Sequence, residues 1–170
     1  MELFLQDDQY PFVATTHRRL IARGIVLDKL DRIAIHEVHR DDRFCKQVYF
    51  ETPGGGVDEG ETIEQGLVRE CSEELGYEVE ILRKLGVVHD FYNLIGRENE
   101  NHFFLARLVK PVGIHFASEG DTLIQRTLYV PLEEAISLYR AQSDELVAGL
   151  VKRRELPMLE EALSVLNARG

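Results

Sequence analysis

Residues 55–77, with the sequence GGVDEGETIEQGLVRECSEELGY, predict a short loop followed by a helix whose two ends are both marked. Thr62 is a favourable N-cap, and Gln65 three residues later can complete a capping box with it. Gly76 is a favourable terminator, because glycine adopts the left-handed conformation that ends many helices. We therefore expect a helix between Thr62 and Gly76, which any fold of this chain has to accommodate.

Two faces of this helix carry different chemistry. At roughly 100° per residue, four residues that can pack in a core share one face, and three glutamates share another face roughly 120° away. The first set is Leu67, Val68, Cys71 and Leu75, and the second is Glu70, Glu73 and Glu74. Carboxylates at this spacing repel each other, and a bound Mg²⁺, which prefers oxygen ligands, would explain them. The alternative is a solvated acidic face.

A glycine-rich loop precedes the helix. Residues 53–56 (PGGG) predict a turn after a strand at residues 48–51, and glycines let a backbone approach a ligand closely. Gly66 costs about 1 kcal/mol in a helix relative to alanine, and on the acidic face it would leave room for something to lie against the helix. Glu61 and Arg69 can form an ion pair that ties the loop to the helix and orients the acids.

The stretch resembles the Nudix box of the MutT-like hydrolases, Gly-x5-Glu-x7-Arg-Glu-U-x-Glu-Glu-x-Gly-U, where U is a bulky aliphatic residue. All seven fixed positions match, namely Gly55, Glu61, Arg69, Glu70, Glu73, Glu74 and Gly76. Cys71 and Tyr77 stand where an aliphatic residue is usual, and both can still pack. The box covers 23 of the 170 residues. Strand order and length make up the rest of the resemblance and are less specific.

The resemblance implies both a fold and a reaction. The fold is an α/β/α sandwich with a mixed central sheet, the box helix packed against it and helices at the C-terminus. The reaction is Mg²⁺-dependent hydrolysis of the diphosphate linkage in a nucleoside diphosphate joined to another group, with Mn²⁺ as a substitute metal. The products would be a nucleoside monophosphate and a second phosphorylated compound. The box does not specify which nucleotide derivative is the substrate.

Residue roles follow from the resemblance position by position. The glutamates of the acidic face would be metal ligands, and the carbonyl of Gly55 another, with Gly55 and Gly56 beside the substrate. Glu61 and Arg69 would be structural partners. The general base stays open between a box glutamate and a loop acid, with Glu119 and Asp121 as the first loop candidates and Glu98 and Glu100 behind them.

Two other functions compete with a hydrolase. A Nudix module that senses a nucleotide without turning it over would be favoured by loss of Arg69 or a box glutamate, and none is lost. The C-terminal part also shows no DNA-binding helix pair. An RNA-decapping enzyme needs a basic path for the RNA chain, and the formal net charge of −10 disfavours it.

The composition indicates one globular domain over residues 1–170. The negative charge argues against stable binding to nucleic acid or to anionic membranes, while a small nucleotide substrate can be neutralised by metal. Cys45 and Cys71 are the two cysteines, and a disulfide between them is not expected because Cys71 lies on the core face of the helix. The chain has neither a long apolar run nor a secretory leader, so we expect a cytoplasmic protein.

The rest of the chain predicts strands around the central helix and further helices at the end. Strands are expected at 17–28, 32–39, 79–92, 102–109 and 124–130, with a polar loop at 93–101 and a short strand or flap within 1–16. Arg18, Arg19 and especially Arg23 are candidates for substrate contacts, against simple solvation. Phe91, Tyr92, Phe103 and Phe104 could stack a base or pack in the core. Helices are expected after Pro131, at 143–154 and at 157–168, the last two for packing or for a homodimer.

Overall fold

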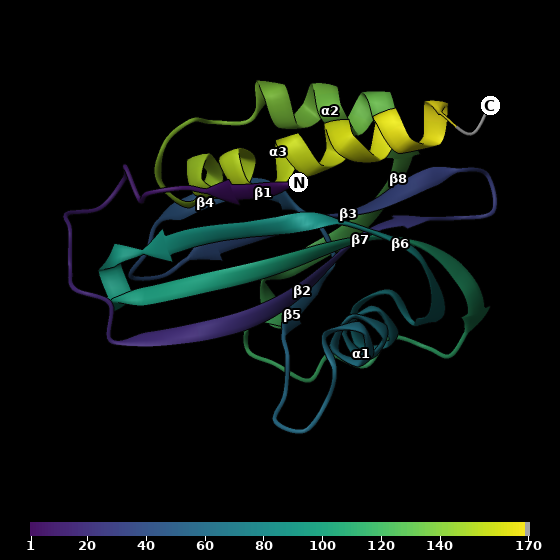
Figure 1. Cartoon of the computed structure of the whole chain (residues 1–170), viewed down its shortest axis with the longest axis horizontal. Coiled ribbons are helices and arrows are strands. Elements are labelled where there is room, and N and C mark those ends of the chain that lie inside the picture. Colours follow the sequence, from purple (N-terminus) through teal and green to yellow (C-terminus); the bar gives the residue numbers. More distant parts are fainter. Residues whose placement is uncertain (169–170) are drawn as a thin grey trace.

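The computed structural model describes residues 1–168, which form a mixed sheet with helices on both faces (Figure 1). Its strand order is β1-β6-β7-β2-β3-β4, with β5 paired to β2 and β8 paired to β3. The strands are β1 (Glu2–Phe4), β2 (His17–Leu27), β3 (Arg32–Asp41), β4 (Lys46–Glu51), β5 (Gly54–Gly56), β6 (Tyr77–Tyr92), β7 (Arg97–Pro111) and β8 (Ile124–Pro131). The helices are α1 (Ile63–Leu75), α2 (Leu132–Ala141) and α3 (Leu146–Asn167), and the predicted domain end at residue 170 lies outside the described residues.

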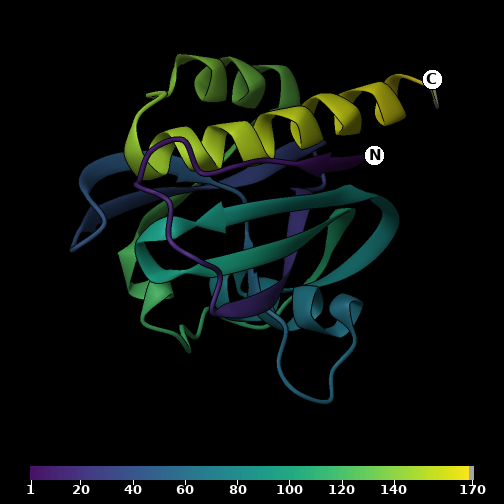
Figure 2. The ribbon, with the colours of Figure 1, turned by 60° about the vertical axis from the view of Figure 1, so that its left-hand side comes forward.

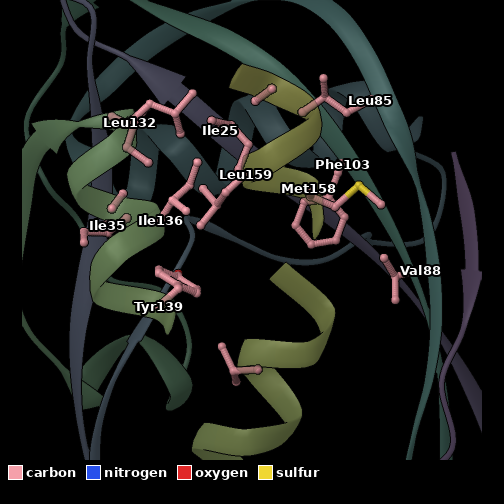
Figure 3. Close-up of a cluster of buried hydrophobic side chains, with 14 of the residues drawn as sticks. Ile25, Ile35, Leu85, Val88, Phe103, Leu132, Ile136, Tyr139, Met158 and Leu159 are labelled. Carbon is pink, nitrogen blue, oxygen red and sulfur yellow. The ribbon is translucent and has the colours of Figure 1, made fainter. Parts of the chain in front are cut away.

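The predicted layered architecture is confirmed. Helix α1 packs on one face of the sheet, and α2 and α3 cover the other (Figure 1). The core under α1 is small and includes Leu67 and Cys71, which are both fully buried. The core under α2 and α3 is larger, and Figure 3 shows Met158 and Leu159 of α3 among its side chains. Cys45 and Cys71 are both free. Within residues 1–168 no helix is both long and apolar enough to cross a bilayer.

The C-terminal helices differ from the prediction. The chain forms one continuous helix, α3, with Pro157 inside it, instead of two helices separated at this proline. An internal proline removes a backbone hydrogen bond and costs about 3 kcal/mol. The apolar residues on both sides of it, among them Val151 and Met158, are fully buried against the sheet and α2. This burial offsets the local cost, so tertiary packing overrides the helix-breaking signal.

The predicted polar loop at residues 93–101 is also wrong. Only Asn93–Ile95 forms a 3₁₀ turn, and β7 begins at Arg97. Buried polar side chains of this strand bond to the neighbouring strand β6: Asn99 and Asn101 each donate to Asp90 Oδ1, at 2.9 and 3.0 Å. A strand whose inward side chains are polar has the composition of a loop.

The glycine run and the N-terminal segment both extend the sheet. Residues 54–56 were expected to form a turn, but they form β5, which pairs antiparallel with β2 at Ile21–Arg23. Gly54 has a φ of 139° and lies directly against the Ala22 carbonyl, so only glycine fits there. The predicted short N-terminal strand is β1, which pairs parallel with β6 (Figure 2).

Candidate active site

The box helix begins and ends where the sequence predicts, because both of its ends are capped. Thr62 and Gln65 form the capping box, and Gly76 ends the helix with a φ of 71°. Leu67 and Cys71 face the sheet, which turns Glu70 and Glu74 toward the strands beside the helix. Both glutamates are less than 10% exposed, and so is Glu73, so the acidic face is not a solvated one.

A cluster of three carboxylates lies between α1 and the loop before β8. Oxygen atoms of Glu70, Glu74 and Asp121 lie within 4.8 Å of one another, and all three residues are buried. Asp121 is held in place by Ser118, whose hydroxyl donates to Asp121 Oδ1 at 2.7 Å while its backbone N–H donates to Oδ2 at 3.1 Å. Glu119 is exposed and does not line the cavity at this cluster. The structure therefore places the alternative loop acid, Asp121, at the box and not Glu119.

The loop strand β5 packs directly against these acids. A Cβ atom added to Gly55 would lie 2.6–2.8 Å from the carboxylate atoms of Glu70, so a side chain here would displace that carboxylate. The backbone N–H of Gly54 donates to Glu74 Oε2 at 3.0 Å, and His36 Nε2 lies 3.0 Å from the same oxygen. Glycine backbone and carboxylates thus share one compact site.

The acids carry more negative charge than the surrounding protein neutralises. Burial raises the pKa of Glu70 to about 7, with Glu74 and Glu73 adding to the effect and Arg69 opposing it. Burial also raises the pKa of Glu74, although His36 and Gly54 favour its charged form. The donors are all oxygen atoms, which is the set that a hard divalent cation such as Mg²⁺ or Mn²⁺ prefers. The residues present therefore fit a metal of this class.

Arg69 forms the predicted ion pair with Glu61 and also contacts two glutamates of the helix and a carbonyl of the loop. Its guanidinium lies 2.7 Å from Glu61, 2.8 Å from Glu70 and 3.4 Å from Glu73, and it donates to the Gly56 carbonyl at 2.8 Å. It therefore ties the loop to the helix, as expected. Glu73 points to Arg69 and does not take part in the cluster formed by Glu70, Glu74 and Asp121.

Gly66 leaves room for this same loop. A Cβ at Gly66 would lie 3.1 Å from Glu61 Oε1 and 3.2 Å from Val57 Cγ2. The partner that lies against the helix at Gly66 is thus the chain's own loop.

The carboxylate cluster opens into a cavity of about 180 Å³. Because strand side chains alternate between faces, β2, β3 and β4 each contribute every second residue to its wall. The contributions are Arg19, Ile21 and Arg23 from β2, His36, Val38 and Arg40 from β3, and Tyr49 and Glu51 from β4. Arg23, the predicted substrate contact, lines this cavity, but its charge is already used by Glu51 at 2.8 Å and Glu155 at 3.5 Å.

A buried ion network closes the far side of the cavity. Arg154 of α3 is 1% exposed, and its Nη2 lies 2.8 Å from both Glu51 and Glu155. Its Nη1 donates to Tyr92 Oη at 3.0 Å. Tyr92, named as a stacking candidate, lines the cavity, whereas Phe103 and Phe104 are buried in the two cores. Arg154, Arg97, Arg40 and His36 were not predicted as site residues, and no local motif marks them.

Known proteins resemble this chain in sequence. The chain matches the NUDIX domain family over residues 17–152. It is 28% identical over 142 residues to Nudix hydrolase 2 of Arabidopsis thaliana, covering 84% of this chain and 49% of that protein. It is 38% identical over 72 residues to the 8-oxo-dGTP diphosphatase of Proteus vulgaris, covering 42% and 62%. The chain thus spans less than two thirds of either relative.

A solved structure shares the fold. The NUDIX hydrolase from Nitrosomonas europaea superimposes with a TM-score of 0.65 at 18% identity, over 86% of this chain and 88% of that one. At this identity the likeness concerns the arrangement of the sheet and helices.

Proposed function

Since the chain belongs to the NUDIX domain family, we propose that it hydrolyses the diphosphate linkage of a nucleoside diphosphate joined to another group, in a reaction dependent on Mg²⁺ or Mn²⁺. The products are a nucleoside monophosphate and a second phosphorylated compound. The names of the two relatives, a Nudix hydrolase and an 8-oxo-dGTP diphosphatase, support a hydrolase that acts on a phosphoanhydride.

The observation that carries this proposal is the buried carboxylate cluster beside the glycine strand. Burying three carboxylates whose oxygen atoms lie within 4.8 Å of one another would cost free energy if no cation neutralised them. The glycines of β5 leave no side chain between these carboxylates and the cavity. A bound divalent cation supplies positive charge that neutralises the diphosphate oxygens. The acidic protein can in this way accept an anionic substrate.

The residue roles in this proposal follow the geometry. Glu70 and Glu74 hold the cation, together with the Gly55 carbonyl. In the pattern of the family Glu73 is also a metal ligand, and for this its carboxylate has to move away from Arg69, with which it is paired in the structure. Arg69, paired with Glu61, keeps the loop against the helix so that Gly55 and Gly56 border the substrate.

The general base in this proposal is the loop acid Asp121. Its carboxylate is buried at the cluster and is oriented by Ser118, so it can accept the proton of the water that attacks phosphorus. Glu119, the other loop candidate, is exposed two residues away. The two acids therefore make a direct comparison: Asp121→Asn should abolish turnover, whereas Glu119→Gln should leave most of it.

The test is a phosphate-release screen in millimolar Mg²⁺ over nucleoside triphosphates, nucleotide sugars and dinucleoside polyphosphates, coupled to a phosphatase that reveals phosphorylated products. Turnover of some of these compounds, abolished by chelator and by Glu70→Gln, is the expected result. Binding of nucleotides in a thermal-shift assay with no turnover across the screen would contradict the proposal and favour a nucleotide sensor.

A further inference from the structure

Within residues 1–168, two arginines of the cavity form no ion pair. Five arginines line it, and three are paired: Arg23 and Arg154 with Glu51, and Arg40 with Asp42 at 3.0 Å. Arg19 and Arg97 form neither an ion pair nor a side-chain hydrogen bond with any residue in 1–168. Their two positive charges thus face the cavity unused.

The strand register brings these two arginines together. Strands β2 and β7 run parallel, with His17 opposite Arg97 and Arg19 opposite Asn99. Arg19 and Arg97 are therefore two residues apart in register, and since both line the cavity they lie on the same face of the sheet. The residue of β7 opposite Arg19 is the neutral amide Asn99, which donates to Asp90 of the next strand, β6, and the charge of Asp90 also acts on Arg97.

The pair lies beside the acid cluster, on the path that a bound substrate would follow. The Arg19 guanidinium is so close to Gly56 that a Cβ added there would lie 2.5–2.9 Å from three of its atoms. Gly56 is next to Gly55, which contacts Glu70. Arg97 lies one step farther, with its guanidinium 5.1 Å from the ring centroid of Tyr92. The order along the cavity is thus acids, Arg19, then Arg97 over Tyr92.

This arrangement is electrostatically incomplete. The Arg97 Nε atom is buried without a hydrogen-bond partner, and a buried polar group of this kind is costly unless something satisfies it. Burial lowers the pKa of Arg97 below its ordinary value and the nearby charge of Arg19 acts in the same direction, while Tyr92 and Asp90 oppose the shift. Two adjacent guanidinium groups with free N–H donors match the oxygen atoms of a phosphate.

We propose that Arg19 and Arg97 form an anion clamp that selects substrates carrying a further phosphate beyond the diphosphate that is cleaved. This inference rests on the proposed function, because it takes the acid cluster as the place where the diphosphate lies. The third phosphate of a nucleoside triphosphate would reach the clamp, and so would the extra phosphates of a dinucleoside polyphosphate. A nucleotide sugar with an uncharged sugar would leave both arginines unpaired.

The test measures binding without turnover. Isothermal titration in Mg²⁺ compares non-cleavable methylene analogues of one nucleoside diphosphate and of its triphosphate. The proteins are the wild type, Arg19→Gln, Arg97→Gln, the double variant and the control Arg18→Gln. Arg18 is the neighbour of Arg19 on the opposite face of β2, where it is exposed and paired with Glu98 and Glu100. Arg97→Lys replaces Arg97→Gln if the latter does not show a cooperative thermal transition.

The expected preference of the wild type for the triphosphate analogue is about tenfold to hundredfold, the range for hydrogen bonds to charged groups. The double variant should bind both analogues equally, and Arg18→Gln should keep the preference. The same titration includes an analogue of a dinucleoside tetraphosphate, in which every phosphate is internal. Weak binding of this analogue means that the clamp holds only a terminal phosphate. Tight binding means that the clamp holds an internal phosphate as well.

Two outcomes would overturn the clamp: a wild-type protein that binds the two analogues equally, or a preference that survives in the double variant. Neither outcome bears on the hydrolase, because the phosphate-release screen measures turnover separately. A preserved preference for the triphosphate analogue in a protein that hydrolyses nothing would support the clamp and refute the hydrolase.

Discussion

Replacing Arg154 with methionine removes a cation from the buried network behind the cavity. Its guanidinium lies 2.8 Å from Glu51 and Glu155 and 3.7 Å from Asp90, and its side chain is 1% exposed. Arg23 remains, so one cation is left where two stood near these carboxylates. Breaking a buried ion pair costs about 3–5 kcal/mol, and because Glu51 and Glu155 keep Arg23 we expect a loss of about 3 kcal/mol.

Urea unfolding followed by circular dichroism measures this loss directly, with an unchanged m value as the sign of an unaltered unfolding transition. For a chain of this length, 3 kcal/mol corresponds to a fall in Tm of about 6–12 °C. The matched control is Arg153→Met, because Arg153 is more exposed and pairs at the surface with Asp8. Surface pairs contribute about 0–1 kcal/mol, so the control should stay within that range.

A double-mutant cycle separates lost charge pairing from lost packing. Glu155→Gln removes the carboxylate that Arg154→Met leaves in excess, so the double variant should cost less than the sum of the two single variants by more than about 1 kcal/mol. Additive costs, or a loss below about 1 kcal/mol for Arg154→Met, would show that the network does not hold this region together.

Four further outcomes are expected. Gly55→Ala pushes a methyl group into the Glu70 carboxylate, so kcat/KM in Mg²⁺ should fall about 10- to 100-fold, as when a metal ligand loses its support; unchanged Mg²⁺ dependence would contradict this. Glu61→Gln removes a partner of Arg69 and should lower Tm by about 2–4 °C in a thermal melt, and an unaltered melt would count against the loop tether. Burial alone would raise the pKa of Glu51, but Arg23 and Arg154 hold it at about 2. The charge of Glu51 therefore stabilises the fold fully above the unfolded-state pKa of 4.5 and progressively less below it. In urea titrations, the difference in free energy of unfolding between wild type and Glu51→Gln should therefore shrink from pH 5 toward pH 2. A difference that stays constant over this range would refute the pairing. Adding Mg²⁺ to chelator-treated protein should raise Tm, and Glu70→Gln should abolish that rise.

The parts of the fold that follow from the sequence are those set by neighbouring residues. The helix ends at Thr62 and Gly76 depend on caps within one turn, and the ion pair of Glu61 with Arg69 spans the same short segment. The strands expected at 17–28 and 32–39, the second of them from its alternation, likewise became β2 and β3. These features need no knowledge of the rest of the chain, because their partners lie close by in sequence.

The parts that could not be predicted depend on distant partners. Arg154 and Glu51 are 103 residues apart, and nothing near either residue indicates the other. The strand at Arg97 was taken for a loop because Asn99 and Asn101, which are buried in it, are polar and donate to Asp90 instead of packing as apolar side chains. Pro157 was taken for the start of a separate helix because the burial of its neighbours, such as Met158, in the core is not visible locally. The sequence left Glu119 and Asp121 as equal loop candidates, because only the position of the loop before β8 against α1 separates them.

The contacts of Arg154 also set an order of events during protein synthesis. The box helix, the glycine strand and β2 all leave the ribosome well before α3, yet the far wall of the cavity needs Arg154 and Glu155 to neutralise Glu51 and Arg23. Until α3 docks, those side chains must stay hydrated, because burying them singly is costly. The nascent chain can therefore form the box helix early, but it acquires the closed cavity only after α3 has been synthesised, so premature termination within α3 would yield a protein that keeps the motif and lacks the cavity.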